Sequence, residues 1–180
     1  MPDFFTLKLI WGGGVLGVKR LVRCAVFVLF ISICSAFALP FGPVPLSLGL
    51  LALVAVSMAG DVKSAVFAIL GYLLLGEVGL PVFAGFKGGL GVIFGPTGGF
   101  LLSYIAVAVV IAVFASRGKA VWGIVLGLLV CYLKGSLWFM IIMKVSFTQA
   151  ISLAVLPFVV PDIIKCILGY YIGKRIKKII

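Results

Sequence analysis

Long apolar runs follow one another along almost the whole chain, and short polar or glycine- and proline-rich breaks separate them. Of the 180 residues, 64% are hydrophobic and only 11% are charged, which leaves too little polar surface to cover a water-soluble globule. In lipid, an α-helix satisfies its backbone hydrogen bonds internally, so runs of this kind favour helices. We therefore expect an all-α integral membrane protein.

The apolar runs predict a single transmembrane domain over residues 1–180, built as a bundle of six helices. About 20 residues cross the hydrocarbon core of a bilayer, so five or six spans fill this length and leave no room for a soluble catalytic domain. The predicted spans are approximately residues 21–39, 46–59, 62–75, 100–115, 120–140 and 161–176. Residues 146–161 are apolar but interrupted by Pro157 and Pro161, which indicates a short helix and a loop packed on the bundle.

Basic residues are distributed unevenly among the breaks, and this distribution predicts the orientation of the bundle. With six spans, eleven basic residues lie on the side of the termini, two lie on the opposite side and two lie within spans. The eleven are Lys8, Lys19, Arg20, Arg23, Lys63, Arg117, Lys119, Lys174, Arg175, Lys177 and Lys178. Because cytoplasmic loops carry the excess of Lys and Arg, we expect cytoplasmic termini in the cell membrane. The net charge of +11 then reflects topology and contact with the lipid bilayer, and not nucleic-acid binding.

The stretch between the third and fourth predicted spans, residues 76–99, holds nine glycines and two prolines and is otherwise almost entirely apolar. In the predicted topology it lies on the outer side, as do residues 40–45, which contain three prolines. Irregular backbone at membrane depth is tolerated only where protein buries it or where it borders a water-filled cavity. We interpret both segments as loops that cap an outward-facing cavity, with plain connecting loops as the alternative.

Asp162 and Lys165 need an explanation because they lie at the start of the last predicted span. Their i, i+3 spacing places both side chains on one helix face. One interpretation is an intrahelical ion pair. The other is an acceptor and a cation directed into the outer cavity, since charges within a membrane commonly have a function. Such a pair suits a ligand with N–H donors at one end and a carboxylate at the other.

Other side chains near the outer face each admit two interpretations. Lys134, in the fifth predicted span, either extends to the surface along its own aliphatic chain or faces the cavity. Lys87 either holds an anionic group at the cavity mouth or is hydrated, and Glu77 is a candidate partner for it. Phe83 and Trp138 either pack or anchor the chain at the membrane interface, or they form walls of an apolar pocket.

The sequence also lacks the residues that several classes of protein require. It has no histidine, and its four cysteines lie in apolar runs without metal-ligand spacing, so we expect no metal or other cofactor. Neither of its Gly-Lys pairs is followed by Ser or Thr, as a Walker-type phosphate loop requires. Four acidic residues leave little for acid–base catalysis. We therefore expect a capture protein that takes energy from partner subunits, and not an enzyme.

Several motifs, in their order and spacing, resemble the BioY family, the biotin-specific substrate-binding (S) components of energy-coupling factor (ECF) transporters. The most specific is "GLPVF" (Gly79–Phe83) followed by "GPTGGF" (Gly95–Phe100). Supporting motifs are "PVPLS" (Pro43–Ser47), "GSLWF" (Gly135–Phe139) and "PFVVPDIIK" (Pro157–Lys165). The resemblance runs from about residue 25 to residue 165, which is most of the chain.

The resemblance implies a six-helix bundle that captures extracellular biotin beneath the first and third inter-helix loops. It also implies partners, namely a transmembrane coupling (T) protein and two cytoplasmic ATPases that power delivery across the membrane. Asp162 would accept hydrogen bonds from the ureido N–H groups of biotin. Lys165 would make polar contacts, with the valerate carboxylate as a candidate. An S component for another small vitamin and a structural membrane protein remain alternatives.

The residues expected to contact the substrate come mainly from the two loops and the last span. They are Ser47, Val82, Phe83, Gly85, Phe86, Lys87, Gly95, Pro96, Thr97, Gly98, Trp138, Asp162 and Lys165. The chain departs from the family pattern at Ser47-Leu48, where Thr-Gln is usual, and at Leu29, where a small residue would follow Ala25 at a spacing of four. Ser32 and Ala36 keep two small residues four apart, so Ala25, Ser32 and Ala36 are the expected docking positions for the coupling protein.

Overall fold

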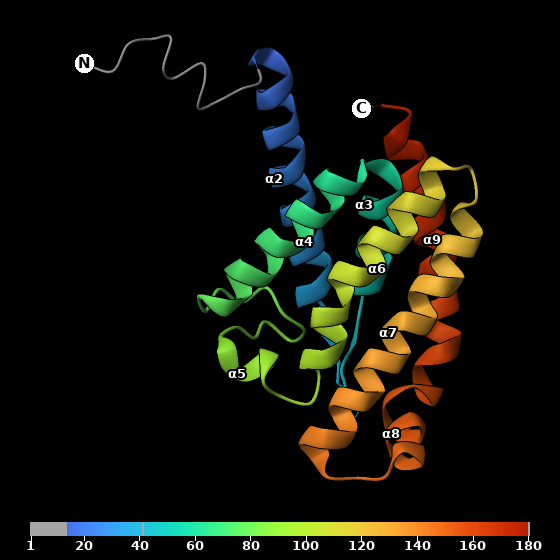
Figure 1. Cartoon of the computed structure of the whole chain (residues 1–180). Helices are drawn as coiled ribbons and strands as arrows, with labels where there is room; N and C mark the ends of the chain where they lie inside the picture. Colours follow the sequence, from blue (N-terminus) through green and yellow to red (C-terminus); the bar gives the residue numbers. More distant parts are fainter. Residues whose placement is uncertain (1–13, 41, 180) are drawn as a thin grey trace.

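The computed structural model describes residues 14–40 and 42–179, which form a bundle of helices with one small antiparallel strand pair (Figure 1). The elements follow in the order α2 (Gly14–Ala36), β1 (Ala38–Leu39), β2 (Leu46–Ser47), α3 (Gly49–Ala59), α4 (Val62–Glu77), α5 (Leu90–Ile93), α6 (Gly98–Ser116), α7 (Ala120–Met143), α8 (Phe147–Ala154), the 3-10 turn η1 (Leu156–Phe158) and α9 (Val159–Lys177). The prediction of a mainly helical fold is confirmed.

Three stretches of the described chain are long and apolar enough to cross a membrane, judged by length and composition. They are Gly98–Ser116, Ala120–Met143 and Phe147–Lys177, the last of which includes α8 and η1. Helix α3 is apolar but shorter, with 11 residues. A helix occupies each of the six predicted ranges, but the number of crossings and the side on which the termini lie stay predictions. Lys8, which contributed to the predicted orientation, lies outside the described residues.

The helix ends differ from the predicted ones near prolines and glycines. Helix α2 begins at Gly14 and ends at Ala36, and the chain then enters strand β1, since a residue before proline, here Leu39, favours an extended backbone. Ala38 pairs with Ser47 and Leu39 with Leu46, so the two strands form a hairpin. The predicted 76–99 loop is shorter than expected, because α4 continues to Glu77 and α5 interrupts the remainder.

Helix α3 forms the centre of the bundle, and all of its residues are buried. Helix α9 approaches it closely through two glycines. A Cβ atom at Gly169 would lie 2.7 Å from the carbonyl oxygen of Leu51, and one at Gly173 would lie 2.7 Å from that of Ala55. Small residues at a helix contact allow the two backbones to approach, so these glycines set the distance between α3 and α9.

The two ends of the bundle differ in composition. We call the end that carries the start of α2, the α3–α4 connection and the last turns of α9 the charged end (Figure 1). There Arg23 donates hydrogen bonds to Asp61 at 2.8 Å and to Ser64 at 3.0 Å, and Ser64 donates to Asp61, which joins α2 to the start of α4. Partial burial alone would raise the pKa of Asp61, but the bond from Ser64 and the charges of Arg20 and Arg23 hold that pKa below its usual range.

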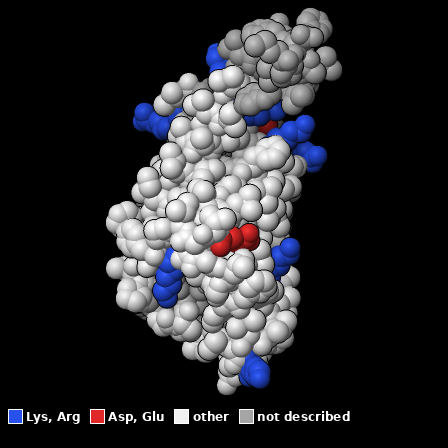
Figure 2. Space-filling model, turned by 90° about the vertical axis from the view of Figure 1, so that its left-hand side faces the viewer, with Lys and Arg blue, Asp and Glu red and all other residues white. Residues whose placement is uncertain are grey.

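We call the opposite end, which carries the 38–47 hairpin, residues 78–97 and α8, the cavity end (Figure 1). Figure 2 shows that uncharged surface dominates the molecule between the two ends, with a few isolated charged side chains. Helix α8 starts with a capping box in which Ser146 and Gln149 bond to each other's backbone N–H groups. The predicted short helix packed on the bundle before the last span is therefore confirmed.

Candidate substrate-binding site

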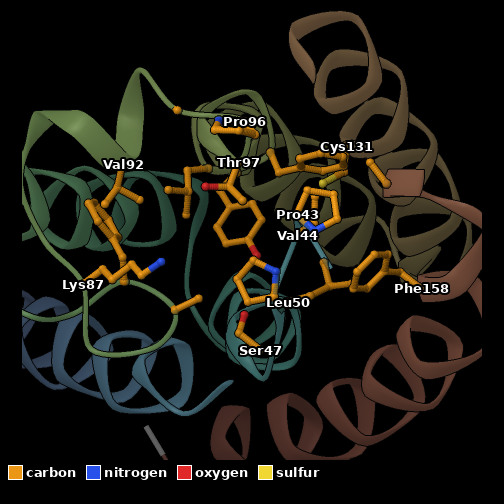
Figure 3. Close-up of a pocket in the computed structure, with 18 of the residues that line it drawn as sticks. Pro43, Val44, Ser47, Leu50, Lys87, Val92, Pro96, Thr97, Cys131 and Phe158 are labelled. Carbon is orange, nitrogen blue, oxygen red and sulfur yellow. The ribbon is translucent and has the colours of Figure 1, made fainter. Parts of the chain in front are cut away.

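A cavity of about 340 Å³ lies at the cavity end, among the hairpin, residues 83–97 and helices α3, α6, α7 and α9 (Figure 3). Its volume lies in the range of small-molecule sites, about 300–1,000 Å³. Its walls are mainly apolar and carry a small number of polar groups, which is the usual composition of a pocket that binds and orients one small ligand.

The two predicted loops both border this cavity. The hairpin contributes Pro43, Val44, Pro45 and Ser47, and the following loop contributes Phe83, Ala84, Lys87, Gly91, Val92, Gly95, Pro96 and Thr97. The prolines fix the backbone of the hairpin turn, and the glycines let the main chain itself approach the cavity. The irregular backbone of both segments therefore borders a cavity, as the sequence predicts.

Phe83 anchors the second loop. Its side chain is completely buried, and its ring covers Gly76, where any Cβ atom would overlap the ring. The ring also packs edge-on against Tyr72, with centroids 5.4 Å apart. The N–H of Phe83 donates to the carbonyl of Lys87 at 2.9 Å, and the N–H of Gly89 donates to that of Gly76 at 2.6 Å. The loop thus folds back on the end of α4 and presents Phe83 to the cavity.

The tip of the same loop is attached to α2. The N–H of Gly85 donates to the carbonyl of Ala36 at 3.0 Å, and the rings of Phe86 and Phe37 pack edge-on with centroids 5.3 Å apart. Gly85 has a φ of 74° and Phe86 a φ of 56°, the left-handed region that glycine enters readily and phenylalanine rarely. The tip is therefore held in a tight turn against the end of α2.

The main polar group of the cavity joins α7 to α9. The amine of Lys165 donates to Oδ1 of Asp162 at 2.8 Å, and the hydroxyl of Tyr132 donates to Oδ2 at 2.9 Å. Asp162 is 7% exposed and Lys165 is 8% exposed, and all three side chains line the cavity. Asp162 lies in the first turn of α9, where the helix dipole favours an acid. The two interpretations of Asp162 and Lys165 are compatible, because the residues form an intrahelical ion pair and this pair faces the cavity.

Lys87 is the other cation at the cavity. Its side chain is exposed at the mouth, and Figure 3 shows its amine directed toward the cavity. No ion pair joins it to Glu77 in the described part of the chain. Lys134 is exposed on α7 and is absent from the cavity lining, which agrees with the interpretation that it extends outward.

Comparison with known proteins identifies the family. The model of the BioY family matches residues 7–180. The chain belongs to the BioY family. It is 38% identical over 160 residues to the probable biotin transporter BioY of Pyrococcus horikoshii, covering 88% of this chain and 96% of that protein. It is 35% identical over 167 residues to the biotin transporter BioY of Thermotoga maritima, covering 90% and 98% of the two chains.

A solved structure agrees with these BioY relatives. The crystal structure of the S-component for biotin from an ECF-type ABC transporter matches with a TM-score of 0.84 and 25% sequence identity, over 92% of this chain and 94% of that one. The family resemblance seen in the motifs is thereby confirmed. The related BioY proteins are described as transporters and not as enzymes, in agreement with the absence of catalytic motifs from this sequence.

Five predicted contact residues of this BioY chain do not line the cavity. They are Val82, Gly85, Phe86, Gly98 and Trp138. Trp138 instead supports the loop from behind, since its indole N–H donates to the carbonyl of Gly95 at 2.9 Å. Gly98 lies against the backbone of Ile93 and leaves no room for a side chain. These residues position the cavity wall without forming its surface.

The sequence did not single out several residues that form the cavity of this BioY protein. The most informative is Tyr132, because it bonds directly to Asp162. Tyr104, Phe100 and Leu101 also line the cavity, from α6. Phe100 ends the "GPTGGF" motif, but nothing in the sequence marks Tyr132, Tyr104 or Leu101, because they lie in uniformly apolar helices and the cavity faces only part of each helix.

The predicted docking residues of the BioY chain do not share one exposed face. Ala25 is exposed on α2, but Ser32 is 6% exposed and Ala36 is 5% exposed. The carbonyl of Ala36 also accepts the hydrogen bond from Gly85. Small residues at these two positions therefore serve packing inside this chain.

Proposed function

We propose that this chain is the biotin-capturing S component of an ECF-type importer. It would bind extracellular biotin in the cavity and deliver it across the cell membrane. The observation that carries the proposal is the buried pair of Asp162 and Lys165, which faces a mainly apolar cavity in a member of the BioY family. Burying a charged pair is costly, and charged side chains within membrane segments commonly mark a substrate or ion site.

The chemistry of biotin fits the arrangement of side chains. Its ureido group offers N–H donors beside a carbonyl acceptor, its bicyclic ring is largely apolar, and its valerate chain ends in a carboxylate. Asp162 would accept from the ureido N–H groups, and Phe83 and Tyr104 would contact the ring. Because Lys165 already lies 2.8 Å from Asp162, it would meet the same ureido end of the ligand. Lys87 at the mouth would then hold the carboxylate.

The transport cycle would depend on partner subunits. With six spans and cytoplasmic termini, the cavity end lies outside the cell, and the charged end meets the coupling protein and its two ATPases. The chain carries no phosphate-binding loop, so ATP hydrolysis belongs to those partners. The excess of basic residues at the termini supports this orientation.

The proposal is tested by calorimetry with biotin and the purified protein in detergent. Asp162→Asn should weaken binding by about fivefold to 150-fold, because about 1–3 kcal/mol is lost when a buried polar group is left unsatisfied. Lys134→Gln serves as the matched control, since that side chain is exposed and does not line the cavity. Thiamine serves as the control ligand. Absence of biotin binding to a folded, monodisperse protein would refute the specificity, and unchanged binding in Asp162→Asn would move the site.

A further inference from the structure

Tyr132 completes a polar group whose three members differ in chemistry. Asp162 accepts hydrogen bonds, Lys165 donates as a cation, and Tyr132 donates through a neutral hydroxyl. Asp162 and Lys165 belong to α9, whereas Tyr132 reaches the carboxylate from α7, 30 residues away in the sequence. A carboxylate has two oxygens, and here each of them already receives one donor. Because Tyr132 and Asp162 both line the cavity, a ligand donor that approaches Oδ2 from the cavity lies beside the Tyr132 hydroxyl.

We infer that Tyr132 determines specificity for a cyclic urea, by donating to the ureido carbonyl of the bound ligand. The inference rests on the proposed function and extends it to a residue that the sequence did not reveal. A ureido N–H would take the place of the Tyr132 hydroxyl at Oδ2 of Asp162. The released hydroxyl would then donate to the ureido oxygen, which lies next to that N–H in the ligand. The number of hydrogen bonds does not fall in this exchange, so neither Oδ2 of Asp162 nor the Tyr132 hydroxyl is left without a partner.

The position of Tyr132 supports this exchange over a purely structural role. Its hydroxyl lies 2.9 Å from Oδ2 of Asp162, and its side chain is only half-buried and lines the cavity. A tyrosine that served only to brace Asp162 would be covered on the cavity side. A neutral hydroxyl also suits a carbonyl acceptor. The free-energy cost of removing water from a hydroxyl is smaller than the cost of removing it from a second cation at the same position.

The test compares two ligands in one protein. Biotin and 2-thiobiotin carry the same N–H donors, but sulfur is a much weaker acceptor than the ureido oxygen. The ratio of the two dissociation constants therefore reports the strength of the protein hydrogen bonds to the ureido oxygen. Any effect of a substitution on the ligand-free protein cancels in the ratio, because both ligands bind the same free state.

In Tyr132→Phe, the preference for biotin over 2-thiobiotin should fall by about three- to tenfold, the loss of one hydrogen bond. Tyr170→Phe, on α9 and outside the cavity lining, should leave the preference unchanged. Tyr132→Gln, which keeps an N–H donor, should restore part of it. If Tyr132→Phe does not fold, Tyr132→Gln and Tyr132→Leu provide the same comparison with and without a donor.

The other outcomes are distinct. An unchanged preference for biotin over 2-thiobiotin in Tyr132→Phe would overturn the inference. A preference that fell in Tyr104→Phe but not in Tyr132→Phe would also overturn it, because the donor would then lie on α6. The infrared band of the ureido carbonyl in carbon-13-labelled biotin gives a second readout. This band should shift to higher frequency in Tyr132→Phe, since the carbonyl loses a donor. Failure of the native protein to bind biotin would refute the proposed function itself, which is a separate result.

Discussion

The chain uses a carboxylate, a cation and a hydroxyl twice, once at each end of the bundle. At the charged end, Asp61 is joined by Arg23 and Ser64, and the two ionic side chains are 41% and 27% exposed. At the cavity end, Asp162 is joined by Lys165 and Tyr132, and the corresponding exposures are 10% and 9%.

The difference in burial separates two roles. An exposed pair gains little net stability, because water competes for both partners, but it joins two helices at small cost. A buried pair loses its hydration, so well-packed apolar residues of the same volume would often stabilise the fold better. The group at the charged end is therefore a structural contact between α2 and α4. The group at the cavity end faces a cavity, and in the proposed function it persists because it serves the ligand.

The largest expected effect breaks the buried pair. Lys165→Met leaves the charge of Asp162 with only the Tyr132 hydroxyl, and it should lower the free energy of unfolding by about 3–5 kcal/mol. The double variant Asp162→Asn/Lys165→Met should recover most of that stability but should not bind biotin. Thermal unfolding in detergent and calorimetry measure the two quantities. Normal biotin binding by the double variant would show that the pair is structural at this end as well.

The next effect tests the close contact between α3 and α9, the helix that runs from the cavity end to the charged end. In Gly169→Ala, the added Cβ atom would meet the carbonyl of Leu51, so α9 must shift. Overpacking of this kind should lower the free energy of unfolding by about 1–3 kcal/mol. The matched control is Gly17→Ala on α2, where nothing lies within 4 Å of the new atom. Equal melting temperatures for the two variants would contradict the role of Gly169 in setting the α3–α9 distance.

A smaller effect concerns the cation at the mouth. Lys87 is exposed, so its attraction for a carboxylate is screened, and Lys87→Gln should weaken biotin binding by only about 0.2–1 kcal/mol. The loss should be absent with biotin amide, which has no carboxylate, and thermal stability should not change. Weaker binding of both ligands to the same extent would assign Lys87 to the shape of the loop and not to the carboxylate.

The smallest effect is expected at the charged end. Asp61→Asn should cost less than about 1 kcal/mol of stability at neutral pH, and less again in high salt. The folded-state pKa of Asp61 is lowered, so its stabilising contribution is complete above the unfolded pKa of about 3.9 and is lost as pH falls through the folded pKa. Melting curves of native protein and variant should therefore differ by a constant amount from pH 7 to pH 5. If the difference in melting temperature between native protein and variant changed between pH 7 and pH 5, a group other than Asp61 would be titrating.

Sequence reasoning succeeded where the contacts are local. Asp162 and Lys165 are three residues apart on one helix, so their pairing follows from helix geometry alone. It also identified residues 76–99 as irregular, because glycine and proline act on their own backbone. It missed the partnership of Tyr132 with Asp162, since the rotation of α7 about its axis is set by packing and not by a periodic pattern. It missed the 38–47 hairpin for a related reason, because a ladder of two residue pairs is too short to show alternation.

The contacts of Phe83 also bear on how the chain assembles. The ring on Gly76, the pairing of Phe83 with Lys87 and the bond from Gly89 to Gly76 all lie between residues 76 and 89. Closing so short a loop costs little chain entropy, and contacts between near neighbours in sequence form early in folding. We therefore expect this side of the cavity to form together with the end of α4, before α7 and α9 pack against it. The hydrogen bond from Gly85 to Ala36 is long-range in sequence, so we expect it to form later and to attach the loop to α2.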